Sequence, residues 1–133
     1  MDTEANKKVV LGFYRTAFEE KDPEKALSVF VGDYYKQHNP HVPDGKDGFV
    51  TYAKTRVAKN PGRKLLFKRV FVDGDYVILH IHHVFTPTDE AFVGAPHGMA
   101  GVDIFRLENG KIVEHWDVLQ PVPAEASHNN TMF

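Results

Sequence analysis

Two aspartates and a histidine in the last third of the chain are the residue types of an acid/base site. Asp103 and Asp117 each interrupt an apolar run, and His115 precedes Asp117 by two residues. A carboxylate in a strand that packs on a core is costly unless it is paired or used, although one that faces water needs no such explanation. Burial and a nearby like charge both raise a carboxyl pKa, as proton transfer near neutral pH requires. These three residues are therefore the candidate catalytic group.

Histidine is a second source of chemistry, with eight in the chain. His80 and His82 are two residues apart on an expected strand, so they project from one face, and His38 ends a shorter strand. A metal site of cupin type would need a Glu four or five residues after the second His, where Thr86 and Pro87 stand instead. We therefore expect no metal and interpret His38, His80 and His82 as substrate-binding residues. A metal-dependent enzyme that uses these three histidines remains an alternative.

Aromatic residues recur at helical spacing in the first half of the chain. Residues with this spacing belong to the core, and the inner end of such a core can form the wall of a pocket. The aromatic residues expected to contact a substrate are Tyr14, Phe18, Phe49 and Tyr52.

The expected elements follow from the periodicity. Helical patterns cover residues 4–21, 23 to about 31 and 46–59, and Asp22-Pro23 forms the start of the second helix. Period-two patterns predict strands at 34–39, 64–72, 76–86, 99–107 and 111–119, with a loop at 87–98. We expect one α+β domain, 1–133, in which three N-terminal helices and a cone-shaped, curved, mostly antiparallel sheet enclose a pocket. Its core spans about residues 5–121, and 122–133 form a polar tail.

Composition excludes several other classes of protein. The 18 acidic and 16 basic residues give a net charge of −2, and the basic stretch from Lys54 to Arg69 lacks an RNA-binding signature, so no nucleic-acid partner is expected. The chain has no cysteine, no serine-hydrolase elbow and no glycine-rich phosphate loop, so we expect no cofactor. No signal peptide or apolar run of membrane-spanning length is present, which favours a cytoplasmic protein without membrane contact.

The segment GVDIFRLENGKIVEHWD, residues 101–117, resembles the closing hairpin of the nuclear-transport-factor-2-like superfamily. Within it, residues 114–117 (EHWD) resemble the SnoaL-like polyketide cyclases. Residues 35–40 (YKQHNP), followed by 43–45 (PDG), resemble predicted SnoaL-like aldol-condensation enzymes. The order of elements agrees from about residue 5 to Pro121.

The resemblance implies a deep pocket, a homodimer and a cofactor-free enzyme that acts on a small carbonyl substrate by aldol condensation, cyclisation or isomerisation. Asp117 aligns with the aspartate that serves as acid and base, whereas Asp103 replaces a pocket histidine. We expect His115, His38 or the His80/His82 pair to hydrogen-bond the enolate oxygen, and Asp103 to orient that donor or share a proton with Asp117. A non-catalytic binding domain of the same fold is the alternative.

The faces of the last hairpin depend on its turn. If Asn109-Gly110 alone form the turn, Asp103 and Asp117 point to opposite faces; if Glu108 joins the loop, Asp103 opposes His115 and lies diagonal to Asp117. We expect the longer loop, because it collects the three polar residues on one face, as the resemblance implies. The other face is then apolar and would form the dimer interface, with Val102, Ile104, Ile112, Trp116 and Val118.

Overall fold

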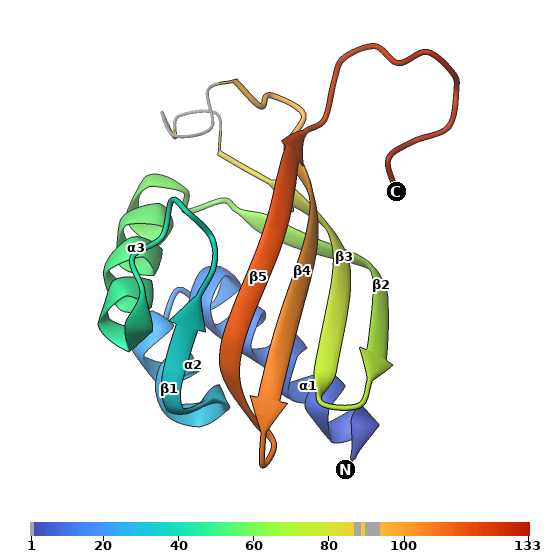
Figure 1. Cartoon of the computed structure of the whole chain (residues 1–133). Helices are drawn as coiled ribbons and strands as arrows, with labels where there is room; N and C mark the ends of the chain where they lie inside the picture. The colour runs from blue at the N-terminus through green and yellow to red at the C-terminus, as the bar shows by residue number, and fades with distance from the viewer. Residues whose placement is uncertain (1, 87–88, 90–93) are drawn as a thin grey trace.

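The computed structural model describes residues 2–86, 89 and 94–133. Three helices cover one face of a curved, unclosed sheet of five strands, which confirms the expected α+β class (Figure 1). The helices are α1 (Thr3–Tyr14), α2 (Pro23–Phe30) and α3 (Gly45–Lys59). The strands are β1 (Val31–Gln37), β2 (Lys64–Asp73), β3 (Tyr76–Val84), β4 (Met99–Glu108) and β5 (Lys111–Pro121). Within the described residues no helix is long and apolar enough to span a membrane.

The sheet has the strand order β1-β5-β4-β3-β2. Only the β1–β5 pair is parallel; β2 to β5 form an antiparallel meander, as the two-residue periodicity predicts. Because α2 leads directly into β1, this strand reaches the far edge of the sheet beside β5. The end of β1 and the middle of β5 therefore lie side by side (Figure 1).

The first helical segment changes pitch before it ends. Instead of one helix over 4–21, α1 stops at Tyr14 and the chain continues as a π-helical segment, Arg15–Glu19. Tyr14 and Phe18 are both buried, and their ring centroids are 5.9 Å apart. Single π-helical turns often occur at functional sites, and both rings line the cavity described below. The second helix starts as expected, with the Asp22 side chain accepting from the backbone N–H of Lys25 at 3.1 Å.

The turn between β4 and β5 differs from the expected one. Asn109 and Gly110 alone form it, with φ values of 51° and 76°, as a type I′ turn requires. Glu108 consequently pairs with Lys111. The expected three-residue loop is wrong, because the Asn-Gly pair adopts the short turn that it intrinsically favours.

One extra residue in β5 offsets the short turn. Leu107 pairs with Ile112, but Arg106 pairs with Glu114, which leaves Val113 as a β-bulge. A bulge shifts every later residue of its strand to the other face relative to a regular ladder. The bulge therefore reverses the effect of the short turn on the faces of the hairpin.

The register places Asp103 directly opposite Asp117, and Phe105 opposite His115. The expected pairing of Asp103 with His115 was wrong by two residues, so all three polar residues still share the helix-covered face. Ile112, which was assigned to the outer face, is instead fully buried in the core, because it precedes the bulge. The expected outer set otherwise keeps its position, with Val102 and Val118 exposed.

The chain after Pro121 leaves the end of β5, loops away from the sheet and brings the C-terminus back toward β3 (Figure 1). The ring of Phe133 stacks on His82, with centroids 4.3 Å apart, and lies 5.7 Å from His80. The tail therefore covers part of β3 on the side away from the helices.

Candidate active site

A cavity opens between α3, the chain after β1 and the end of β5. Its outer part has a volume of about 700 Å³ and is mainly apolar, with Pro43, Ala95, Met99, Leu119 and Pro121 among its lining residues. A smaller inner part, of about 40 Å³, lies deeper. Both parts are lined by Asn39, Tyr52 and Leu119, so the outer part leads to the inner part.

The inner cavity holds most of the expected catalytic and aromatic residues. Its polar wall includes Asp117 and His115, and its aromatic wall is formed by Tyr14, Phe18, Tyr35, Phe49 and Tyr52. Asp103 lies behind this wall, fully buried, in contact with His115 and Tyr14.

Asp103, Tyr14 and His115 form a triangle of polar groups. Tyr14 Oη donates to Asp103 Oδ1, and His115 Nε2 lies 2.8 Å from that oxygen. Tyr14 Oη is also 3.3 Å from His115 Nε2. Burial acts to raise the pKa of Asp103, but the hydrogen bond and charge of His115, assisted by Tyr14, outweigh it and hold this pKa below its ordinary value.

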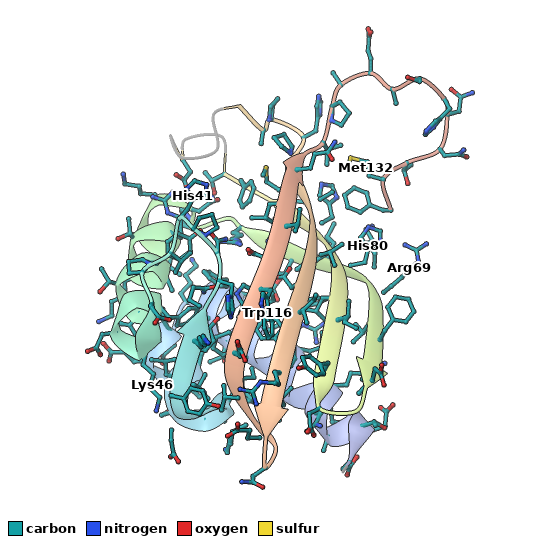
Figure 2. All side chains as sticks on the ribbon, viewed as in Figure 1. His41, Lys46, Arg69, His80, Trp116 and Met132 are labelled. Atoms are coloured by element: carbon teal, nitrogen blue, oxygen red, sulfur yellow. The ribbon has the colours of Figure 1, made fainter. Side chains whose placement is uncertain are left out.

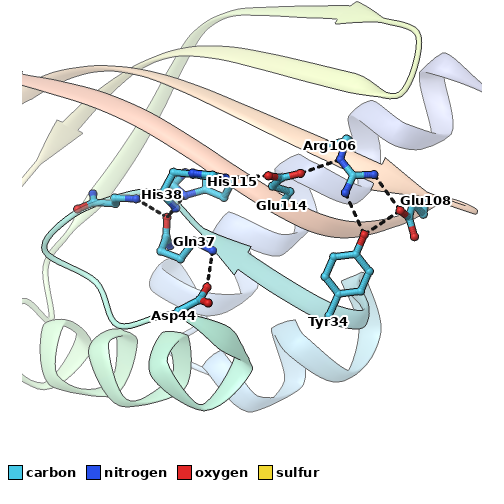
Figure 3. A network of polar contacts seen from close by, with 9 residues as sticks. Tyr34, Gln37, His38, Asp44, Arg106, Glu108, Glu114 and His115 are labelled. Carbon is cyan, nitrogen blue, oxygen red and sulfur yellow. Dashed lines mark hydrogen bonds and ion pairs between the residues drawn. The ribbon is translucent and has the colours of Figure 1, made fainter.

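Gln37 requires a proton on Nδ1 of His115. Its side-chain oxygen accepts from the backbone N–H groups of His38 and Asn39, at 3.0 and 2.9 Å. His115 Nδ1 lies 2.8 Å from the same oxygen and must donate to it (Figure 3). A bare Nε2 and a carboxylate would repel each other at 2.8 Å, so one proton is held between His115 Nε2 and Asp103 Oδ1.

Asp117 lines the cavity in a different electrostatic environment. Its Oδ1 accepts from Asn39 Nδ2 at 2.8 Å, and its Oδ2 is 3.9 Å from His115 Nε2. The Asn39 amide is oriented by the backbone N–H of His41, which donates to Asn39 Oδ1 at 2.8 Å. Burial raises the pKa of Asp117; His115 opposes this rise, and the charge of Asp103 adds to it. The inner cavity thus contains a carboxyl group whose pKa is raised above its ordinary value.

Three expected substrate-binding histidines lie outside the cavity. His38 stacks on Trp116 with ring centroids 4.7 Å apart, and its Nε2 is 2.7 Å from Glu114 (Figure 3). His80 and His82 point to the outer face of β3, where Figure 2 shows His80 close to Arg69. They do not line either part of the cavity, because the inward positions of β3 belong to the alternating residues Val77, Leu79, Ile81 and His83.

Sequence reasoning missed four polar residues of the inner cavity: Gln37, Asn39, Arg63 and His83. For His83 the signal was present, because it continues the inward apolar alternation of β3. Gln37 and Asn39 stand within a stretch quoted for its resemblance, but nothing in their spacing indicates that they orient other side chains. Arg63 was considered only as part of the basic stretch from Lys54 to Arg69.

One group in the described part of the chain has the geometry of a metal site: Asp103, His115 and Asp117, with ligand atoms within 4.8 Å of one another. An ion there would have to displace the contacts among Asp103, Tyr14 and His115. His38, His80 and His82 do not converge, since His38 packs on Trp116 and the other two lie beneath the tail. The histidine-based metal hypothesis therefore lacks a common site.

A helix-covered curved sheet with a cavity between its layers is the architecture of the nuclear-transport-factor-2-like fold. The family model for SnoaL-like polyketide cyclases matches residues 8–127, and the chain belongs to this family. No curated protein matches the chain at a level that establishes a relative.

Solved structures agree on the fold. TsrD from Streptomyces laurentii superposes with a TM-score of 0.73 at 20% identity, covering 90% of each chain. A candidate polyketide cyclase from Bacillus cereus has a TM-score of 0.71 at 20% identity, covering 86% of this chain and 74% of that one. IdmH from Streptomyces antibioticus, described as a candidate polyketide cyclase, has a TM-score of 0.67 at 20% identity, covering 86% and 91%.

Proposed function

We propose that the protein is a cofactor-free enzyme that abstracts a proton alpha to a carbonyl group of a small substrate, for aldol condensation, cyclisation or isomerisation. One observation carries this proposal: a carboxyl group with a raised pKa, Asp117, faces a cavity and is paired across the ladder with Asp103, which shares a proton with His115. Two titratable groups whose environments push their pKa values apart form a common acid/base arrangement.

Each side chain has a distinct role in the proposed reaction. The Asp117 carboxylate takes the proton, and the electron pair of the broken C–H bond moves into the enolate. Tyr14 and His115 line the same cavity and, to stabilise the enolate oxygen, each would redirect to it the hydrogen bond that it gives Asp103 in the free protein. The enolate carbon then attacks a second carbonyl group, whose oxygen takes the proton from Asp117 as its π bond breaks, or Asp117 returns the proton to another carbon. Asp103 lies behind the cavity wall and is a positioning residue.

The proposal is tested by the exchange of α-hydrogens for deuterium in a neutral ketone, 2-tetralone, and in an oxo acid, 4-oxo-4-phenylbutanoate, followed by NMR in D₂O. We expect the wild-type protein to accelerate exchange and Asp117→Asn to reduce the rate about 100-fold or more, the range of general-base contributions. Asp33→Asn makes the same change at an exposed position of β1 and should leave the rate unaltered. No acceleration by the wild-type protein, or full activity of Asp117→Asn, would contradict the proposal.

Two alternatives make different predictions in the same assay. A non-catalytic binding domain would bind the ketone without exchange. A metal-dependent enzyme built on Asp103, His115 and Asp117 would lose activity on chelation and regain it with one specific divalent ion. We expect chelation to have no effect, because an ion would have to displace the contacts that Asp103 Oδ1 makes with Tyr14 and His115.

A further inference from the structure

Arg63 directly precedes β2 and sends its guanidinium group into the wall of the inner cavity. The group lies over the ring of Phe18, 4.2 Å from its centroid, and 5.2 Å from the ring of Phe85. These aromatic contacts hold the guanidinium plane in place. Arg63 therefore shares the cavity with Asp117 and His115 rather than extending into solvent.

The hydrogen-bonding capacity of this guanidinium is mostly unused. Arg63 Nη2 is 2.9 Å from His83 Nδ1. Its Nε and Nη1 atoms, which carry three N–H donors, are buried and have no hydrogen-bond partner among the described residues. Within that part of the chain, no carboxylate forms an ion pair with Arg63.

The neighbouring histidine cannot neutralise Arg63. Burial and the charge of Arg63 lower the pKa of His83 to about 3, so His83 is a neutral acceptor. A guanidinium keeps its charge at all ordinary pH values. A buried charge with free donors is costly unless an anion binds it, and the free protein contains a cationic position without its partner.

We infer that Arg63 binds a carboxylate group of the substrate, so that the substrate is an oxo acid rather than a neutral ketone. This inference rests on the proposed function and narrows its substrate class. The planar fork of donors matches a carboxylate, and an inner cavity of about 40 Å³ has room for such a small planar group. The apolar body of the substrate would extend into the outer cavity, past Leu119.

The position of Arg63 also explains how an anion can bind beside Asp117. Without a cation, a substrate carboxylate would meet the negative charge of Asp117 at close range and be repelled. Arg63 lines the same cavity and offsets this repulsion. The carbonyl end of the substrate would then lie next to Asp117, on the side of the outer cavity.

The test compares 4-oxo-4-phenylbutanoate with its neutral amide by isothermal titration calorimetry at pH 7. We expect the wild-type protein to bind the acid about tenfold or more tightly than the amide, as the loss of a charge-assisted hydrogen bond implies. Arg63→Gln should equalise the two dissociation constants by weakening the acid alone. Arg69→Gln, the same change on the outer face of β2, should retain the preference.

Equal binding of acid and amide by the wild-type protein, no binding of the acid at millimolar concentration, or an undiminished preference in Arg63→Gln would each overturn the inference. If Arg63→Gln does not fold, Arg63→Lys takes its place, because it keeps the charge without the planar set of donors. The comparison of acid and amide in the wild-type protein then still tests whether the site prefers a carboxylate. Asp117→Asn should bind the acid at least as tightly as the wild type. A failure of deuterium exchange would thus contradict the proposed reaction and leave the binding result standing.

Discussion

Asp103 and Asp117 are direct partners across the β4–β5 ladder, yet their environments move their carboxyl pKa values in opposite directions. Asp103 is fully buried, and its hydrogen bonds from His115 and Tyr14 overcome the effect of burial. Asp117 accepts one hydrogen bond from Asn39, and burial prevails. Two identical side chains at opposed positions thus have carboxyl groups with oppositely shifted pKa values.

We expect Asp117→Asn to raise the melting temperature at pH 7. The folded-state pKa of Asp117 is raised, so its contribution to stability is fully present below the unfolded-state pKa, about 3.9, and is lost as pH rises through the folded-state value. At pH 7 the ionised carboxylate therefore destabilises the fold, and an amide still accepts from Asn39. Differential scanning calorimetry at pH 7 and pH 3 checks this: a gain at pH 7 that persists undiminished at pH 3 would refute it.

The rate of α-proton exchange should rise with pH through the pKa of Asp117. Because burial raises this pKa, the midpoint should lie above that of an ordinary aspartate. A pH–rate profile of kcat/KM for 2-tetralone exchange measures the midpoint. A flat profile across the acidic range would show that another group acts as the base.

Asp103→Asn should destabilise the protein by about 2–3 kcal/mol at neutral pH, because hydrogen bonds to a charged group are lost. The pKa of Asp103 is lowered in the folded state, so its stabilising effect is present above the unfolded-state pKa and lost as pH falls through the folded-state value. Urea unfolding should show the wild-type advantage at pH 7 shrinking below about pH 4. An advantage that stays constant down to pH 2 would contradict this assignment.

We propose that the outer face of the sheet forms a homodimer. A groove of about 610 Å³ runs over β3, β4 and β5, lined by Tyr76, Ile78, Val102, Ile104, Trp116 and Val118, and the Val118 side chain is 76% exposed. Sedimentation should show a dimer at micromolar concentration and a monomer for Val118→Glu, since a buried unpaired charge is costly. Thr131→Glu, in the exposed tail, serves as the control. A monomeric wild-type protein would disprove the interface.

Periodicity predicted nearly all of the elements, because their inward faces are strongly apolar. The grouping of Asp103, His115 and Asp117 on one face was predicted correctly, but from the wrong turn. The residue types around Val113 do not indicate a bulge, so the longer turn was the expected way to bring the three residues together. A turn and a bulge have the same effect on which face a residue occupies, so argument from faces alone cannot distinguish them.

The polar residues around the cavity were harder to predict. Arg63 lies in a run of basic residues that are mostly solvent-exposed, and only the packing of Phe18 and Phe85 separates it from them. Gln37 and Asn39 act through backbone and amide hydrogen bonds that depend on the chain after β1 folding back beside β5. Such contacts are set by tertiary structure and have no local sequence pattern.

The bulge at Val113 also constrains how this hairpin can change during evolution. A single-residue insertion in the Asn109-Gly110 turn would exchange the inner and outer faces of the rest of β5, moving His115 and Asp117 out of the cavity and Trp116 into it. Loss of the bulge in the same lineage would restore them. We therefore expect turn length and bulge to be inherited as a matched pair, so that relatives with Asp103, His115 and Asp117 on one face conserve the parity of the hairpin even where its residues differ.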